Sequence, residues 1–74
     1  MSAVRKRSVS INAHRTSYSI EDEFQAALEQ IAASRDLPLA KLIAEIDAEP
    51  RPDGGLSSAL RVFVLNDALA KIQG

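Results

Sequence analysis

"HRTSYSIEDEFQAALEQIA" (residues 14–32) changes its hydrophobic period halfway along, and this change predicts the fold. Up to Ile20 the residues alternate with a period of two, which is typical of a half-buried strand. One face of that strand holds Thr16, Tyr18 and Ile20, and the other holds Arg15, Ser17 and Ser19. From Glu21 the period becomes 3.6, so a strand over about 15–20 runs directly into a helix over about 21–34.

The predicted helix over 21–34 has one apolar stripe and an acidic first turn. The stripe follows the i, i+3, i+4 rule through Phe24, Ala27, Leu28, Ile31 and Ala32. Three acids, Glu21, Asp22 and Glu23, lie where the helix dipole favours negative charge.

A second alternating stretch precedes the strand. Val9 and Ile11 share one face, whereas Ser8 and Ser10 share the other, which predicts a short strand over 8–11. Residues 1–7 are polar and basic, and we expect a flexible basic arm there. The pattern leaves two alternatives open for the region before Arg15: a strand that flanks 15–20, or an arm.

The C-terminal half predicts two more helices. Pro38 breaks the pattern after the first helix, because the residue before a proline avoids the helical region. The second helix, over about 38–48, has the stripe Leu39, Leu42, Ile43 and Ile46. The stretch "EPRPDGG" (49–55) predicts an exposed loop, and a third helix follows over about 57–72.

The third helix is apolar on two sides. Leu60, Phe63 and Val64 lie on one side, and the other is covered by Val62, Leu65, Leu69 and Ile72. A helix with two apolar sides needs burial on both. A chain of 74 residues has little material for that, so a partner subunit is the natural source.

Composition limits the classes of protein that this chain can be. There is no Cys and only one His, which excludes disulfides and argues against a zinc site, so we expect no cofactor and no metal. A small core without such staples is commonly completed by oligomerisation. No apolar run is long enough for a membrane span and no signal-peptide core follows the basic start, so a cytoplasmic protein is expected.

The formal net charge of -1 conceals an asymmetry. Residues 1–20 contain four basic and no acidic side chains, whereas residues 21–74 contain five basic and ten acidic ones. A cationic segment on an acidic body suggests a face offered to a polyanion, and a solvated basic tail is the alternative.

The search for chemistry favours binding over catalysis. The acids show no spacing that suggests a buried pair, His14 has no orienting acid beside it in the sequence, and Gly54-Gly55 lacks the remaining residues of a phosphate loop. We therefore expect no enzyme and no catalytic residues. The polar strand face suits DNA, because a two-stranded antiparallel ribbon fits the major groove and Arg can contact guanine bidentately. The alternative is a strand face that simply meets water.

The stretches "HRTSYSIEDEFQAALEQIA", "LAKLIAEID" and "LSSALRVFVL" together resemble the ribbon-helix-helix transcription factors, and in particular a group of small bacterial ribbon-helix-helix domains. The resemblance covers about residues 5–70. It implies a mainly α fold with a short N-terminal β-ribbon and an intertwined homodimer in which each subunit supplies one strand. The strand over 8–11 and the third helix are additions to this plan. The domain would span residues 8–74.

The resemblance also implies a sequence-specific transcriptional regulator that inserts the ribbon into the major groove of double-stranded DNA. By position, the base contacts are Arg15, Ser17 and Ser19. The basic arm and the strand connection suggest phosphate contacts at Arg5, Lys6, Arg7 and His14. The dimer core would be formed by Tyr18, Ile20, Phe24, Leu28, Leu42, Ile46, Phe63 and Leu65.

Two features depart from the family's pattern. Pro38 stands where a Ser or Thr cap is usual and lacks an N–H for a phosphate at the start of the second helix, and a loop and third helix extend the two-helix plan. These departures and the acidic body keep an alternative function open: an adaptor or antitoxin that acts mainly through a protein partner.

Overall fold

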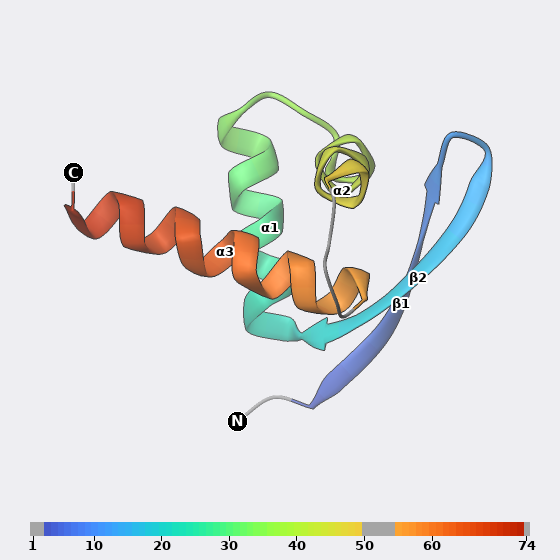
Figure 1. Cartoon of the computed structure of the whole chain (residues 1–74), viewed down its shortest axis with the longest axis horizontal. Coiled ribbons are helices and arrows are strands. Elements are labelled where there is room, and N and C mark those ends of the chain that lie inside the picture. The colour runs from blue at the N-terminus through green and yellow to red at the C-terminus, as the bar shows by residue number, and fades with distance from the viewer. Residues whose placement is uncertain (1–2, 50–54, 74) are drawn as a thin grey trace.

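The chain opens with an antiparallel β-hairpin, and three helices follow it (Figure 1). The structure, a computed structural model, describes residues 3–49 and 55–73. Strand β1 (Val4–Ile11) pairs with β2 (His14–Glu21), and the helices are α1 (Asp22–Ser34), α2 (Leu39–Ala48) and α3 (Leu56–Gln73). This order confirms the predicted fold class, a mainly helical domain with a β-ribbon, an extra first strand and a third helix.

A two-residue turn closes the hairpin. Ile11 lies opposite His14, so only Asn12 and Ala13 connect the strands. Both have positive φ, 52° and 68°, which is the conformation of a type I′ turn. The twist of that turn matches the right-handed twist of the strands, and it brings them together with very little loop to close.

Strand β1 is longer than predicted. It begins at Val4 rather than at Ser8, so residues 4–7 belong to the strand and the prediction of a flexible arm over 1–7 is corrected there. The period of two continues through the basic residues, which places Arg5 and Arg7 on the same face as Val9. Residues 1–2 lie outside the described residues. Of the two alternatives for this region, the flanking strand is the one that forms.

One edge of β2 is occupied by β1 of the same chain, over all eight residue pairs. The two-residue turn favours this pairing, because a neighbour so close along the chain costs little closure entropy. The predicted ribbon between subunits would use the other edge of β2, and it stays a prediction.

The helix ends depart slightly from the predicted ones. Helix α1 starts at Asp22 rather than Glu21 and ends in a Schellman motif, in which Asp36 has φ 57° and Leu37 N–H donates to Ala32 O at 2.9 Å. Pro38 is the N-cap of α2, not its first residue. Its missing N–H therefore lies before the helix, and the N–H groups of the first turn are retained.

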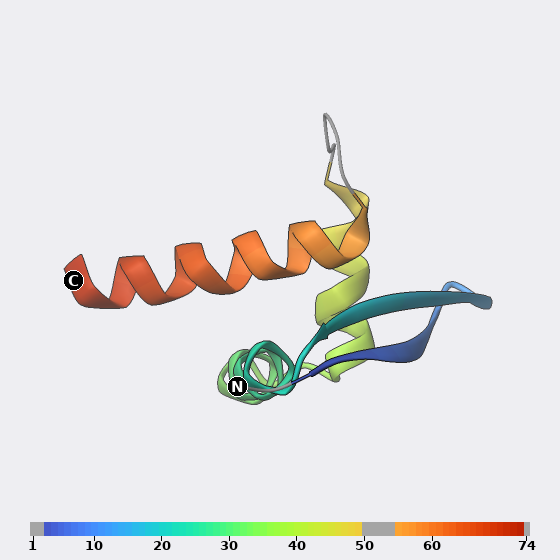
Figure 2. The ribbon, with the colours of Figure 1, turned by 90° about the horizontal axis from the view of Figure 1, so that it is seen from below.

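One continuous core joins the hairpin to the helices. Its fully buried side chains come from β2 and all three helices: Ile20, Leu28, Leu42, Ile43 and Leu60. Ile11 and Tyr18 extend this core along the inner face of the hairpin. The helices thus cover one face of the two-stranded sheet and leave the other uncovered (Figure 2).

The N-terminal part of α3 is tied to the free edge of β2. Ser19 N–H donates to Ser57 Oγ at 2.8 Å, and Arg61 Nη2 donates to Ser19 O at 3.3 Å. Arg61 Nε also donates to Glu21 Oε1 at 3.0 Å. A hydrogen bond from its own backbone N–H, together with the one from Arg61, holds the pKa of Glu21 below its ordinary value of 4.5.

The turn predicts a stabilising substitution. Ala13→Gly should raise the free energy of unfolding by about 0.5–1 kcal/mol, because glycine adopts positive φ without the steric cost that alanine meets. Urea unfolding measures the change. Ala26→Gly, at an exposed position within α1, is the control and should lower stability by a similar amount. A destabilised Ala13→Gly protein would contradict the type I′ turn.

The contact between Glu21 and Arg61 predicts a pH dependence. Since the folded-state pKa of Glu21 is lowered, its ionised form stabilises the fold above pH 4.5, and this contribution is lost as the pH falls through the lowered folded value. Glu21→Gln should therefore be less stable than the wild type at neutral pH, and the gap should close in acid. Urea midpoints measured from neutral pH to about pH 3 provide the measurement. Glu45→Gln is the control, because it removes the charge of an exposed side chain on α2.

Candidate nucleic-acid interface

The outer face of the hairpin is polar and faces away from the helices. The register brings four cross-strand pairs together on this face: Val4 with Glu21, Lys6 with Ser19, Ser8 with Ser17, and Ser10 with Arg15. All of these side chains are exposed except those of Ser19 and Glu21, which are half-buried. The sequence predicted Arg15, Ser17 and Ser19 on one face, and the burial pattern of β2 agrees with that alternation.

The side chains of this face are of the kinds that can contact base edges in a DNA groove. The three pairs nearest the tip contain two cations and four hydroxyls, and the carboxylate of the fourth pair, Glu21, is bound by Arg61. Short serine side chains let a base edge come close to the backbone, and each hydroxyl can donate or accept a hydrogen bond. From Ser19 to Arg15 the strand rises about 13 Å, which is comparable with the width of the major groove.

The tip of the hairpin projects beyond the helices (Figures 1 and 2). Arg15 lies near this tip, next but one to the turn, and Lys6 lies towards the other end of the same face. His14 also lies at the tip, but on the opposite face, where it pairs with Ile11 and is exposed. The end of the outer face that holds Arg15 is therefore accessible.

Arg5 and Arg7, two further predicted phosphate contacts, also lie on the inner face. Arg7 Nη2 donates to Asp22 Oδ1 at 2.8 Å, and Arg5 Nε lies 3.4 Å from the same oxygen. The Arg7 side chain is only 29% exposed, and its Nε is buried with no hydrogen-bond partner among the described residues. Arg7 therefore holds β1 to the start of α1, whereas Arg5 remains 67% exposed.

A buried hydrogen bond fixes which face of β2 points outwards. Tyr18 Oη donates to Gln25 Oε1 at 2.9 Å, and Gln25 Nε2 donates to Glu29 Oε2 at 3.1 Å. Burial raises the pKa of the Tyr18 phenol. Because the strand has a period of two, anchoring Tyr18 inwards forces Ser17 and Ser19 outwards.

Sequence reasoning missed three residues that position this face. Gln25 has a signal in the sequence, since it is a polar residue in line with Leu28 and Ala32 on the buried side of α1. Ser57 and Arg61 bind the edge of β2 from about 40 residues away in sequence, and no local pattern reveals such a contact.

The predicted dimer-core residues divide into two groups. Five are buried within the single chain: Tyr18, Ile20, Leu28, Leu42 and Ile46. Phe24 and Phe63 are half-buried, and Leu65 is 54% exposed. Only the second group has apolar surface left for another subunit.

Other kinds of site find little support in the part of the chain that the structure describes. Within residues 3–49 and 55–73, no three His, Asp or Glu side chains gather as metal ligands. None of the helices in those ranges is long and apolar enough to cross a membrane.

Comparison with known proteins agrees with this architecture. The family model described as "Ribbon-helix-helix domain" matches residues 4–68, from the start of β1 into α3. Neither the curated proteins nor the solved structures contain a significant match to the chain. Because the matching family model covers most of the chain and runs through both strands and all three helices, the chain belongs to the ribbon-helix-helix domain family.

Proposed function

We propose that this protein is a sequence-specific DNA-binding regulator that presents the outer face of its hairpin to the major groove. The observation that carries the proposal is the composition of that face: hydroxyl and cationic side chains from Lys6 and Ser19 to the tip, with the carboxylate of Glu21 at the far end bound by Arg61, on a ribbon that projects past the helices. Ribbon-helix-helix domains generally bind DNA in transcription regulators or antitoxins, and they typically dimerise.

Each residue of the face has a defined role in this proposal. Arg15 contacts a base edge from the tip, and Ser17 and Ser19 follow it along the groove as shorter donors and acceptors. Lys6, Arg5 and His14 contact phosphates, which adds affinity without sequence choice. Arg7 was also predicted to contact phosphate, but its ion pair with Asp22 supports a positioning role.

The inter-subunit ribbon that the sequence predicted remains part of this proposal. Within each chain β1 pairs with one edge of β2, and a homodimer brings the two β2 strands to the DNA together. Regulation of transcription places the protein in the cytoplasm of a bacterial cell, in contact with the chromosome.

A second candidate function is an adaptor or antitoxin that acts through a protein partner. The observation that favours it is the apolar side of α3, where Val62, Leu65, Leu69 and Ile72 are between 43% and 79% exposed. Retention of the protein on duplex DNA at low salt separates the two functions, because an adaptor that has lost the DNA role would not be retained.

Arg15→Ala should weaken specific binding about 5- to 150-fold, the range expected for one bidentate base contact, and relax the preference at one base pair. The preferred duplex is first selected from a random pool with the wild-type protein, and fluorescence anisotropy then measures affinity for it and for scrambled DNA. Arg15→Lys is the matched variant, which keeps the charge but loses the bidentate geometry. Unchanged discrimination in Arg15→Ala would contradict the assignment.

Lys6→Ala should weaken binding to selected and scrambled duplexes alike and lower the slope of log affinity against log salt by about one. A salt titration of both complexes provides the measurement. Lys71→Ala is the control, since Lys71 lies near the far end of α3, where it pairs with Asp67 at 2.9 Å. An equal loss in both variants would show that the charge of Lys6 acts only at long range.

A further inference from the structure

Two side chains from the start of α3 occupy the free edge of β2. Ser19 N–H donates to Ser57 Oγ at 2.8 Å, and Ser19 O accepts from Arg61 Nη2 at 3.3 Å. These two contacts are called the α3 cap below. Unpaired backbone groups on an edge strand are a template for another strand, and the α3 cap removes those of Ser19 from that role.

The hydrogen-bond pattern of the hairpin identifies the other residues on this edge. In an antiparallel pair, the N–H and C=O of one residue point to the same side of the strand, and successive residues point to opposite sides. Because those of Ser19 point away from β1, those of Ser17 and Arg15 also do so. The free edge of β2 therefore presents the backbone of Arg15, Ser17 and Ser19, the residues whose side chains form the proposed base contacts.

A ribbon made from two β2 strands needs the residue that the α3 cap occupies. Two identical antiparallel strands related by a twofold axis pair about a common centre. The register that uses all three edge residues is centred on Ser17, and it pairs Ser19 of each copy with the partner's Arg15. The backbone of Ser19 cannot bond to that partner strand while Ser57 and Arg61 hold it.

Helix α3 is held to the rest of the chain by few buried residues. Of its 18 residues only Leu56 and Leu60 are buried, whereas α2 buries three of its ten. Elements with few buried apolar contacts open at low free energy. The first turn of α3 can therefore move away from β2 with the loss of the Leu56 packing, while the core formed by β2, α1 and α2 is kept.

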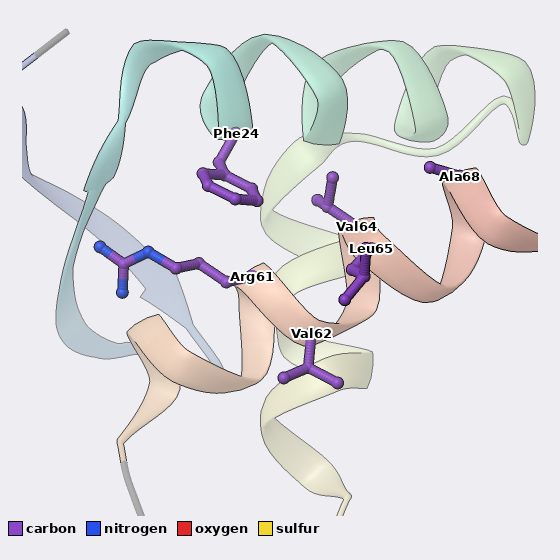
Figure 3. A pocket seen from close by; sticks show the side chains of 6 residues that line it. All are labelled: Phe24, Arg61, Val62, Val64, Leu65 and Ala68. Atoms are coloured by element: carbon purple, nitrogen blue, oxygen red, sulfur yellow. The ribbon is translucent and has the colours of Figure 1, made fainter. Parts of the chain in front are cut away.

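Arg61 can release Ser19 and keep its other contacts. Figure 3 shows its side chain extending from α3 towards β2, with Phe24 reaching from α1 on the same side. The guanidinium lies 5.9 Å from the centre of the Phe24 ring, and its Nε lies 3.0 Å from Glu21 Oε1. A shallow apolar groove of about 370 Å³ beside it provides room for the movement. The contact with Ser19 O, at 3.3 Å, is longer than the ion pair with Glu21.

We propose that the α3 cap is an autoinhibitory contact, in which Ser57 and Arg61 occupy the edge of β2 that a second copy requires and must release Ser19 before the ribbon between subunits forms. The inference rests on the proposed function, in which two β2 strands reach the DNA together, and it adds the regulation of that site. The single chain keeps its edge covered, and DNA binding depends on the concentration of the chain because only paired chains present both strands.

Ser57→Ala tests the proposal, because it removes one partner of Ser19 and leaves every side chain of the outer face in place. The dissociation constant of the dimer should fall about 5- to 150-fold, since one net hydrogen bond corresponds to about 2- to 12-fold and each dimer releases two caps. The dilute single chain should become less stable, because it loses the same bond. A serine that only stabilises the fold would weaken the fold and the dimer together.

Sedimentation velocity over a range of concentrations measures the dissociation constant, and urea unfolding of the dilute chain measures stability. Ser58→Ala is the matched control, because Ser58 is the next residue of α3 and is exposed. Its dissociation constant should stay within about twofold of the wild type. Ser57→Thr retains a hydroxyl and should remain closer to the wild type than Ser57→Ala. Amide hydrogen exchange reports on the cap directly, since the Ser19 N–H of the dilute chain should exchange faster in Ser57→Ala.

Three outcomes would overturn the proposal: an unchanged or higher dissociation constant in Ser57→Ala, a Ser19 N–H that exchanges equally slowly in the dilute variant, or wild-type and variant chains that both stay monomeric. Failure of the DNA proposal is distinguishable, because none of these measurements contains DNA. If only the DNA role is wrong, Ser57→Ala still dimerises more tightly and neither protein is retained on duplex DNA at low salt. If both proposals hold, Ser57→Ala binds duplex DNA more tightly than the wild type below the wild-type dissociation constant and equally well above it.

Discussion

The inward anchoring of Tyr18 and Ile20 is the constraint on which the rest of the structure depends. Tyr18 is held by burial and by its hydrogen bond to Gln25, and Ile20 is fully buried between the hairpin and the helices. A strand cannot turn one residue inwards without turning its neighbours outwards. The outward position of Arg15, Ser17 and Ser19 is therefore a consequence of core packing. The same core packing holds the proposed DNA-contacting face in place.

Helix α3 serves three purposes because three sides of it differ in chemistry. Its inner side completes the core through Leu60, and its start binds the edge of β2 through Ser57 and Arg61. Its outer side exposes Val62, Leu65, Leu69 and Ile72, which no described part of the chain covers.

Several of the basic side chains in the N-terminal segment and on α3 are paired with acids, which the net charge of each segment does not show. Two acids at the junction of β2 and α1 form ion pairs with these bases: Glu21 pairs with Arg61, and Asp22 pairs with Arg7 and with the more exposed Arg5. These pairs hold elements together at the inner face and the strand edge. Lys6 and Arg15 remain on the outer face, so the cationic character available to a polyanion is concentrated on one side of the hairpin.

The sequence by itself determined the alternation of the strand, the change of period at Glu21, the order of elements and the two apolar sides of α3, because each depends on local periodicity. Only the tertiary structure decided that residues 4–7 join the sheet, that β2 pairs within its own chain and that Arg7 is committed to Asp22. It also decided that Ser57 and Arg61 cap the strand edge. Those features depend on contacts between residues far apart in sequence, or on positive φ at Ala13, a residue type that rarely adopts it. Features of these two kinds produce no periodic pattern in the sequence.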